Sequence, residues 1–105
     1  MAKGFHRVAQ VSQVLPGQAK VVRVADREIA LCNVGGRFYA IANICTHDGG
    51  SLDQGELTGH VIECPRHGAQ FNVKTGEVVR APALVPLKTY EARVQGDDVE
   101  VGLEA

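Results

Sequence analysis

The pattern of apolar and polar residues along the chain predicts short β-strands separated by turns. The alternation is clearest near the C-terminus, where Tyr90, Ala92 and Val94 occupy one face of a strand and charged or polar residues occupy the other. After a turn at residues 96–97, valines continue the inner face across residues 98–101. A period of two residues is typical of a strand with one buried face. We therefore expect an antiparallel hairpin over this region.

A second hairpin is predicted earlier in the chain. Residues 28–34 are apolar at nearly every position, which is typical of a strand that is covered on both faces. A Gly35-Gly36 pair follows, and residues 37–41 are again apolar, so a two-residue turn fits. Further strands are expected at 20–24 and 61–63, and no segment has a convincing helical period. The predicted fold class is an all-β, antiparallel sandwich or barrel.

Two loop-like stretches interrupt this pattern, Cys45-Thr46-His47 and Cys64-Pro65-Arg66-His67, with residues 48–63 between them. Each stretch carries one thiolate ligand and one imidazole ligand. A single zinc ion usually takes close-spaced ligands as matched pairs, two cysteines and then two histidines. Mixed pairs fit two metal ions better, with one cysteine from each loop on the first iron and one histidine from each loop on the second. Such a set corresponds to a [2Fe–2S] centre in which two histidines replace two cysteines.

Composition limits the other classes of function. The chain has 105 residues, which suits one domain. Its net charge is −1, and it has no basic run that would indicate a nucleic-acid surface. No apolar run approaches the roughly 18 residues that a membrane helix needs. The third cysteine, Cys32, has no evident disulfide partner, so we expect it to be a buried strand thiol and the protein to be cytoplasmic.

The two ligand stretches carry a family resemblance. Cys45-Thr46-His47 together with residues 64–68 resembles the signature of Rieske proteins. The length and strand pattern are similar to the ferredoxin component of bacterial aromatic-ring-hydroxylating dioxygenase systems. The resemblance implies one Rieske domain over residues 1–105, with a small cluster-binding subdomain at about 43–72 formed by the two ligand loops. It also implies a proline-containing third loop that caps the cluster, for which residues 80–83 are the candidate.

The same resemblance implies a role for each ligand. Cys45 and Cys64 would bind the inner iron of a Rieske [2Fe–2S] cluster, and His47 and His67 the outer iron. No residue of this chain is expected to be catalytic. The other two histidines, His6 and His60, are expected to be solvated surface residues.

Departures from the respiratory branch of this family are informative. That branch has an extra cysteine in each ligand loop, joined as a disulfide, where this chain has Gly50 and Arg66. It also has a serine and a tyrosine that donate hydrogen bonds to cluster sulfurs, where this chain has Ala69 and Phe71. With fewer hydrogen-bond donors to its sulfurs, the reduced state of the cluster is stabilised less. We therefore expect a reduction potential near the bottom of the family range of roughly −150 to +300 mV.

The function implied is that of a soluble one-electron carrier, not catalytic alone. It would pass electrons from an NAD(P)H-dependent flavin reductase to a terminal Rieske non-haem iron oxygenase. Docking would be transient and near His47 and His67, and the carrier would be a monomer. One alternative is the Rieske-type small subunit of an assimilatory nitrite reductase, and another, of a different class, is a zinc-binding interaction module. Acidic residues flank the ligand loops and form either a solvated rim or a docking patch for a basic partner: Asp48, Asp53, Glu56 and Glu63.

Overall fold

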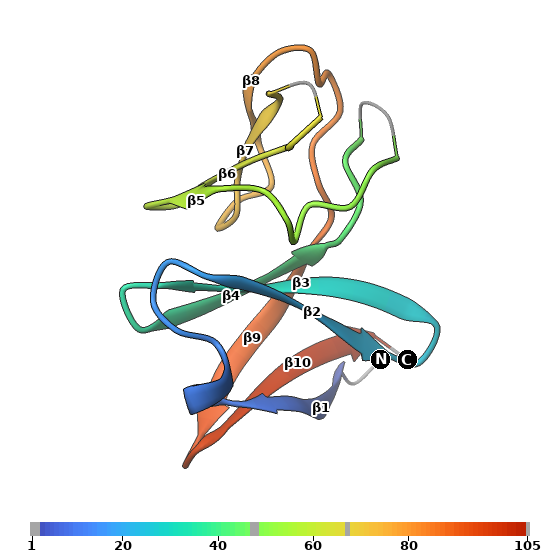
Figure 1. Ribbon diagram of the computed structural model, residues 1–105. Coiled ribbons are helices and arrows are strands. Elements are labelled where there is room, and N and C mark those ends of the chain that lie inside the picture. The colour runs from blue at the N-terminus through green and yellow to red at the C-terminus, as the bar shows by residue number, and fades with distance from the viewer. Residues whose placement is uncertain (1–2, 47–48, 67, 105) are drawn as a thin grey trace.

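The computed structural model describes residues 3–46, 49–66 and 68–104. In the described part of the chain, the regular secondary structure consists of β-strands and one helical segment, the 3-10 turn η1 at Val11–Gln13 (Figure 1). None of the described helical structure is long and apolar enough to cross a membrane. The strands are β1 Lys3–Gln10, β2 Ala19–Val24, β3 Arg27–Val34, β4 Arg37–Ala42, β5 Leu57–Thr58, β6 Val61–Glu63, β7 Gln70–Asn72, β8 Val78–Arg80, β9 Thr89–Gln95 and β10 Asp98–Glu104.

The larger sheet has six antiparallel strands in the order β1-β10-β9-β4-β3-β2. Its two edge strands, β1 and β2, approach each other, so the sheet curls toward a barrel. Gly35 and Gly36 form the turn between β3 and β4 with φ of 59° and 95°. A two-residue turn with both φ values positive matches the twist of the flanking strands, and glycine adopts it without strain. Both hairpins expected from the sequence are confirmed.

The smaller sheet has four short strands in the order β5-β6-β7-β8. It lies beyond one side of the larger sheet, at the top of Figure 1, together with the loops that leave β4 and enter β9. The first ligand stretch follows β4, and the second lies in the hairpin between β6 and β7. Both candidate ligand stretches are therefore at the same end of the molecule.

Strands β3 and β4 separate two hydrophobic cores. On β3, Ile29 and Leu31 pack inside the curled larger sheet, whereas Ala30 and Cys32 face the core that it shares with the smaller sheet. Because successive side chains of a strand point to opposite faces, a strand between two cores is apolar on both faces. This arrangement explains the four consecutive apolar residues from Ile29 to Cys32.

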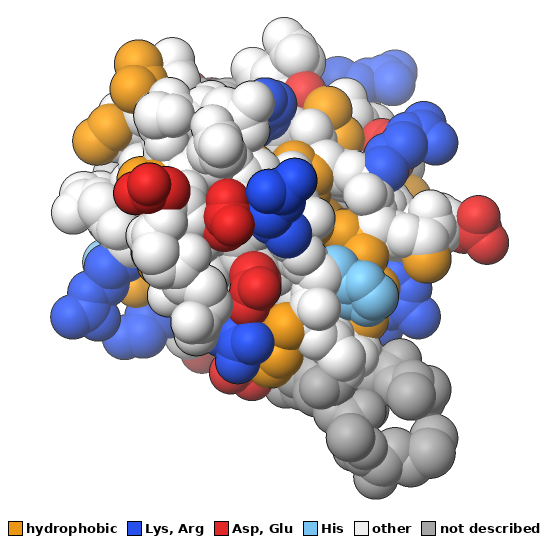
Figure 2. All heavy atoms as spheres, turned by 90° about the horizontal axis from the view of Figure 1, so that it is seen from below, with side chains coloured by type: hydrophobic (Ala, Val, Ile, Leu, Met, Phe, Trp, Pro, Cys, Tyr) orange, Lys and Arg blue, Asp and Glu red, His pale blue; other side chains and the backbone are white. Residues whose placement is uncertain are grey.

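The face opposite the ligand end carries charges of both signs, without a patch of one sign (Figure 2). Elsewhere on the larger sheet, Arg93 on β9 forms an ion pair with Glu100 on β10 at 2.7 Å. One expectation for the C-terminal hairpin was wrong in part. Val94 shares a face with its buried cross-strand partner Val99, as the alternation predicts, but Val94 is 45% exposed and not buried.

Candidate metal centre

The first ligand loop closes on itself immediately after β4. Cys45 donates its backbone N–H to the carbonyl of Gly50 at 2.7 Å, and its own carbonyl accepts from the N–H of Gly49 at 2.8 Å. Gly49 has φ of +77°, a backbone conformation that favours glycine. The Cys45 side chain is buried, with 1% of the residue exposed. The backbone therefore turns the thiol inward.

The second ligand loop repeats the same design. Cys64 donates its N–H to the carbonyl of Ala69 at 2.7 Å, and Gly68 donates its N–H to the carbonyl of Cys64 at 3.1 Å. Gly68 also has φ of +77°, and Cys64 is fully buried. Each cysteine is thus followed by the same two backbone hydrogen bonds at the same offsets, four and five residues later. The two thiols occupy equivalent positions in two matched turns.

Both cysteines belong to the core between the two sheets. Their apolar neighbours in that core include Leu52, Ala69, Phe71 and Ala83. The donor chemistry of the described residues fits the cysteine half of a mixed ligand set, because each of the two matched turns offers one buried thiol. His47 and His67 lie outside the described residues. Among the residues that are described, no three or more His, Cys, Asp or Glu side chains lie together as a metal site.

A third loop, at residues 81–87, lies against the first ligand loop. The hydroxyl of Thr46 donates to the carbonyl of Val85 at 2.5 Å, and Ala83 is buried in the same core as both cysteines. The other end is fixed by Leu87, whose N–H donates to the carbonyl of Gly76 at 2.8 Å. At the tip between these anchors, Leu84 is 88% exposed. The candidate third loop thus lies beside the ligand region, and it extends beyond the expected residues 80–83.

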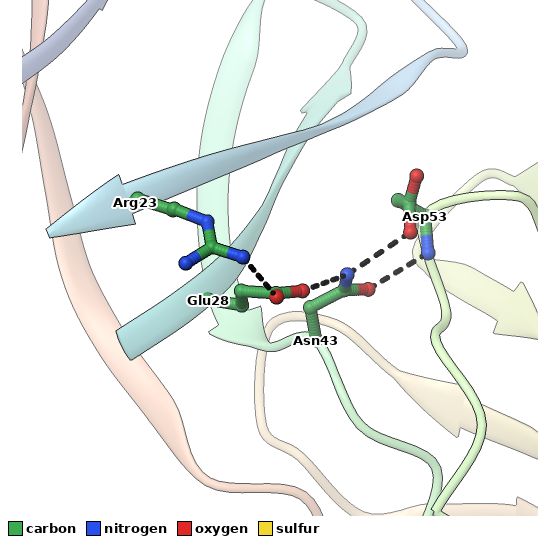
Figure 3. A network of polar contacts seen from close by, with 4 residues as sticks. All are labelled: Arg23, Glu28, Asn43 and Asp53. Carbon is green, nitrogen blue, oxygen red and sulfur yellow. Dashed lines mark hydrogen bonds and ion pairs between the residues drawn. The ribbon is translucent and has the colours of Figure 1, made fainter. Parts of the chain in front are cut away.

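A buried amide next to the first ligand loop was missed by the sequence reasoning. Asn43 accepts hydrogen bonds at Oδ1 from the N–H groups of Leu52 and Asp53, at 2.8 and 2.9 Å. Its Nδ2 donates to carboxylate oxygens of Asp53 at 3.0 Å and Glu28 at 3.5 Å (Figure 3). Glu28 is in turn paired with Arg23 at 2.9 Å. The only signal in the sequence was an asparagine two positions before Cys45.

The acidic residues around the ligand loops are not simply a solvated rim. Burial raises the pKa of Asp53, but hydrogen bonds from Asn43, Gln54, its own backbone and Ser51 outweigh burial and hold the pKa below its ordinary value. Glu63 accepts a hydrogen bond from Gln70 at 2.8 Å. Glu56 is exposed, as expected for a rim residue, and Asp48 lies outside the described residues.

The remaining singled-out residues behave as follows. Cys32 is a free, fully buried thiol in β3, and burial raises its pKa to about 12. His6 and His60 are exposed, as predicted, although the His60 ring packs edge-on against Tyr39 at 5.4 Å between centroids. Arg66 is exposed as well.

A family model for the Rieske [2Fe-2S] domain matches residues 4–91. The chain belongs to this family. It is 38% identical over 98 residues to the ferredoxin component of biphenyl 2,3-dioxygenase from Rhodococcus jostii strain RHA1, covering 93% of this chain and 92% of that one. Membership confirms the expected all-β Rieske fold and the Rieske-type [2Fe–2S] cluster as its cofactor.

Solved structures add to this comparison. The ferredoxin in a complex of reduced oxygenase and oxidised ferredoxin of carbazole 1,9a-dioxygenase superposes with a TM-score of 0.87 at 42% identity, covering 92% of this chain and 91% of that one. A nitrite reductase small subunit from Mycobacterium tuberculosis has a TM-score of 0.90 at 19% identity, covering 100% and 99%. That second likeness shows the shared fold alone. Sequence identity therefore favours the dioxygenase ferredoxins over the nitrite reductase subunits.

Proposed function

We propose that this Rieske protein is a soluble one-electron carrier between an NAD(P)H-dependent flavin reductase and a terminal Rieske non-haem iron oxygenase. The observation that carries the proposal is the pair of matched turns, which present two buried thiols from two loops. Relatives of 38% and 42% identity that are named as ferredoxins of dioxygenase systems support it. The chain is an electron-transfer component and is not catalytic alone.

In the proposed site, Cys45 and Cys64 bind one iron, and His47 and His67 bind the other. The bound cluster supplies a one-electron couple. The chain would contribute the ligands, the burial of the two cysteine sulfurs and a loop that limits access of water. Ala69 and Phe71 are both fully buried beside the two cysteines, and neither offers a side-chain donor in the place where the respiratory branch has one. This apolar surrounding supports the expected low potential.

We further propose that partners dock on the ligand end. Ile44, Leu84 and Val85 are exposed apolar residues on the first ligand loop and the third loop. The hydrogen bond from Thr46 to Val85 holds the two loops together, so exposed apolar side chains are offered by both loops at the ligand end. Electron-transfer contacts are small, below roughly 1,200 Å² in total, which suits a monomer that exchanges two partners.

The organisation and location of the protein are proposals as well. The chain would act as one domain over residues 1–105, in which a cluster-binding subdomain at about 43–72 is attached to the six-stranded sheet. Segment 81–87 would complete that subdomain from outside its sequence range. A buried, free Cys32 fits a reducing cytoplasm.

The test is to purify the protein aerobically, measure iron and acid-labile sulfide, and record the electron paramagnetic resonance spectrum after reduction. A red-brown protein with two irons and two sulfides per chain and a rhombic signal is expected. Cys45→Ser and Cys64→Ser should each abolish the colour, whereas Cys32→Ser should keep it. A colourless protein that contains one zinc would replace the proposal with the zinc-binding interaction module.

A further inference from the structure

Asn43 connects the larger sheet to both ends of the first ligand loop. Its backbone N–H donates to the carbonyl of Glu28 on β3 at 3.1 Å. Its side chain reaches across the loop to Leu52 and Asp53, where the loop ends. The residue is only 7% exposed. Between these two ends lies the turn that holds Cys45.

The amide of Asn43 is used to its full capacity. The oxygen accepts two hydrogen bonds from backbone N–H groups, and the nitrogen donates to two carboxylates, those of Asp53 and Glu28 (Figure 3). An amide offers two acceptor sites and two donors, so none is left over. A carboxylate of the same shape would keep the two accepted bonds. It would lose both donors and would place a third negative charge between two others.

The structure assigns Asn43 as a positioning residue for the first ligand loop, whose amide nitrogen keeps Cys45 in a geometry that retains the metal. This inference rests on the proposed function, because it concerns how the chain holds the proposed cluster. The charged groups that face the Asn43 side chain in the network are Glu28 and Asp53, and Arg23 reaches the network only through Glu28. The charge of Arg23 at the edge of this network does not replace the two hydrogen bonds that the amide nitrogen of Asn43 donates.

The test exchanges the amide and the carboxylate. Three variants of the loaded protein are compared with the wild type: Asn43→Asp, Asp53→Asn and the double exchange. In the double exchange, an amide at position 53 can donate to the carboxylate at position 43, which restores the contact between the two side chains with the roles reversed. Gln13→Glu is the matched control. The amide oxygen of Gln13 also accepts from a backbone N–H, that of Gln10 at 2.8 Å, but Gln13 lies in η1, outside the cluster-binding subdomain.

Two measurements are made on each loaded protein, the rate of iron release to an excess of chelator and the g-values of the reduced cluster. Losing buried donors beside like charges should make iron release from Asn43→Asp about tenfold faster and shift its g-values. The double exchange should return the release rate to within about threefold of the wild type, and Gln13→Glu should leave both readouts unchanged. A rescue of this kind does not follow from a general loss of packing.

The outcomes separate this inference from the proposed function. If the wild type contains no iron–sulfur cluster, the proposed function fails. If the wild type is loaded and Asn43→Asp releases iron at the wild-type rate, only the role of Asn43 is overturned. If Asn43→Asp does not fold, the double exchange decides: a loaded double variant supports the assignment, and a double variant that also fails to load overturns it.

Discussion

Gly55 offers a sharp test of how the two ligand loops are held together. A Cβ atom at this position would lie 2.0 Å from the carbonyl oxygen of Glu63, the residue before Cys64, and 3.1 Å from the carbonyl oxygen of Leu52. Both neighbours are backbone atoms, so no side chain can rotate away. Gly55 does not have a positive φ. The effect of Gly55→Ala is therefore steric and not conformational.

The magnitude follows from the contacts that must give way. Overpacking a tight site costs about 1–3 kcal/mol. Moving Glu63 also strains the hydrogen bond that its backbone N–H donates to the carbonyl of Glu56, with an N···O distance of 2.9 Å. Losing a hydrogen bond costs about 0.5–1.5 kcal/mol. A total of about 2–4 kcal/mol lowers Tm by about 10–20 °C in a domain of this size. Because the displaced strand leads directly into Cys64, the cluster content should fall as well.

The assay is thermal unfolding followed by far-ultraviolet circular dichroism, with the visible absorbance of the cluster recorded in parallel. Gly4→Ala is the matched control, since Gly4 has no positive φ and a Cβ there would meet its nearest atom at an ordinary 3.8 Å. Gly4→Ala should leave Tm within about 3 °C of the wild type. A Gly55→Ala protein with wild-type Tm and full visible absorbance would refute the claim that close backbone packing joins the two loops.

Three other predictions follow from single positions. Burial raises the pKa of Cys32 to about 12 in the folded state, against 9.0 for an ordinary thiol, so the unfolded chain releases this proton first and stability falls between about pH 9 and pH 12. Urea unfolding of Cys32→Ala should lack this part of the pH dependence, and an identical loss in both proteins would contradict it. Ala69→Ser, which places a donor in the buried core of both cysteines, should raise the reduction potential by some tens of millivolts, below a ceiling of about 130 mV, as measured by voltammetry. A lower potential with an intact cluster would show that the hydroxyl does not reach a sulfur. Leu84→Ser, at the exposed tip of the third loop, should slow electron delivery to a Rieske oxygenase several-fold with no change in potential, whereas the same change at Leu15, which is exposed and lies away from the third loop in sequence, should not.

Local sequence determined several strands, although it did not reveal the eight-residue β1 at Lys3–Gln10. Residues 28–34 and 37–41 carry a glycine turn between two apolar runs, and the structure has the hairpin there. The two ligand stretches were also visible from the sequence, because a Rieske motif is a set of residue types at close spacing. Among the short strands, β6 at Val61–Glu63 was predicted, but β5, β7 and β8 were not. These have two or three residues each, too few to show an alternation.

Tertiary structure alone decided which distant groups meet around the ligand loops. Asn43 reaches Asp53, Thr46 reaches Val85 and Gly55 packs on Glu63, and none of these pairs has a periodic or local signature. Val94 shows that alternation alone does not predict burial. It lies on the expected face of its strand, but it is 45% exposed because no second layer covers it. The physical reason is that periodicity reports one strand and its faces. What lies against a face depends on how the two sheets come together.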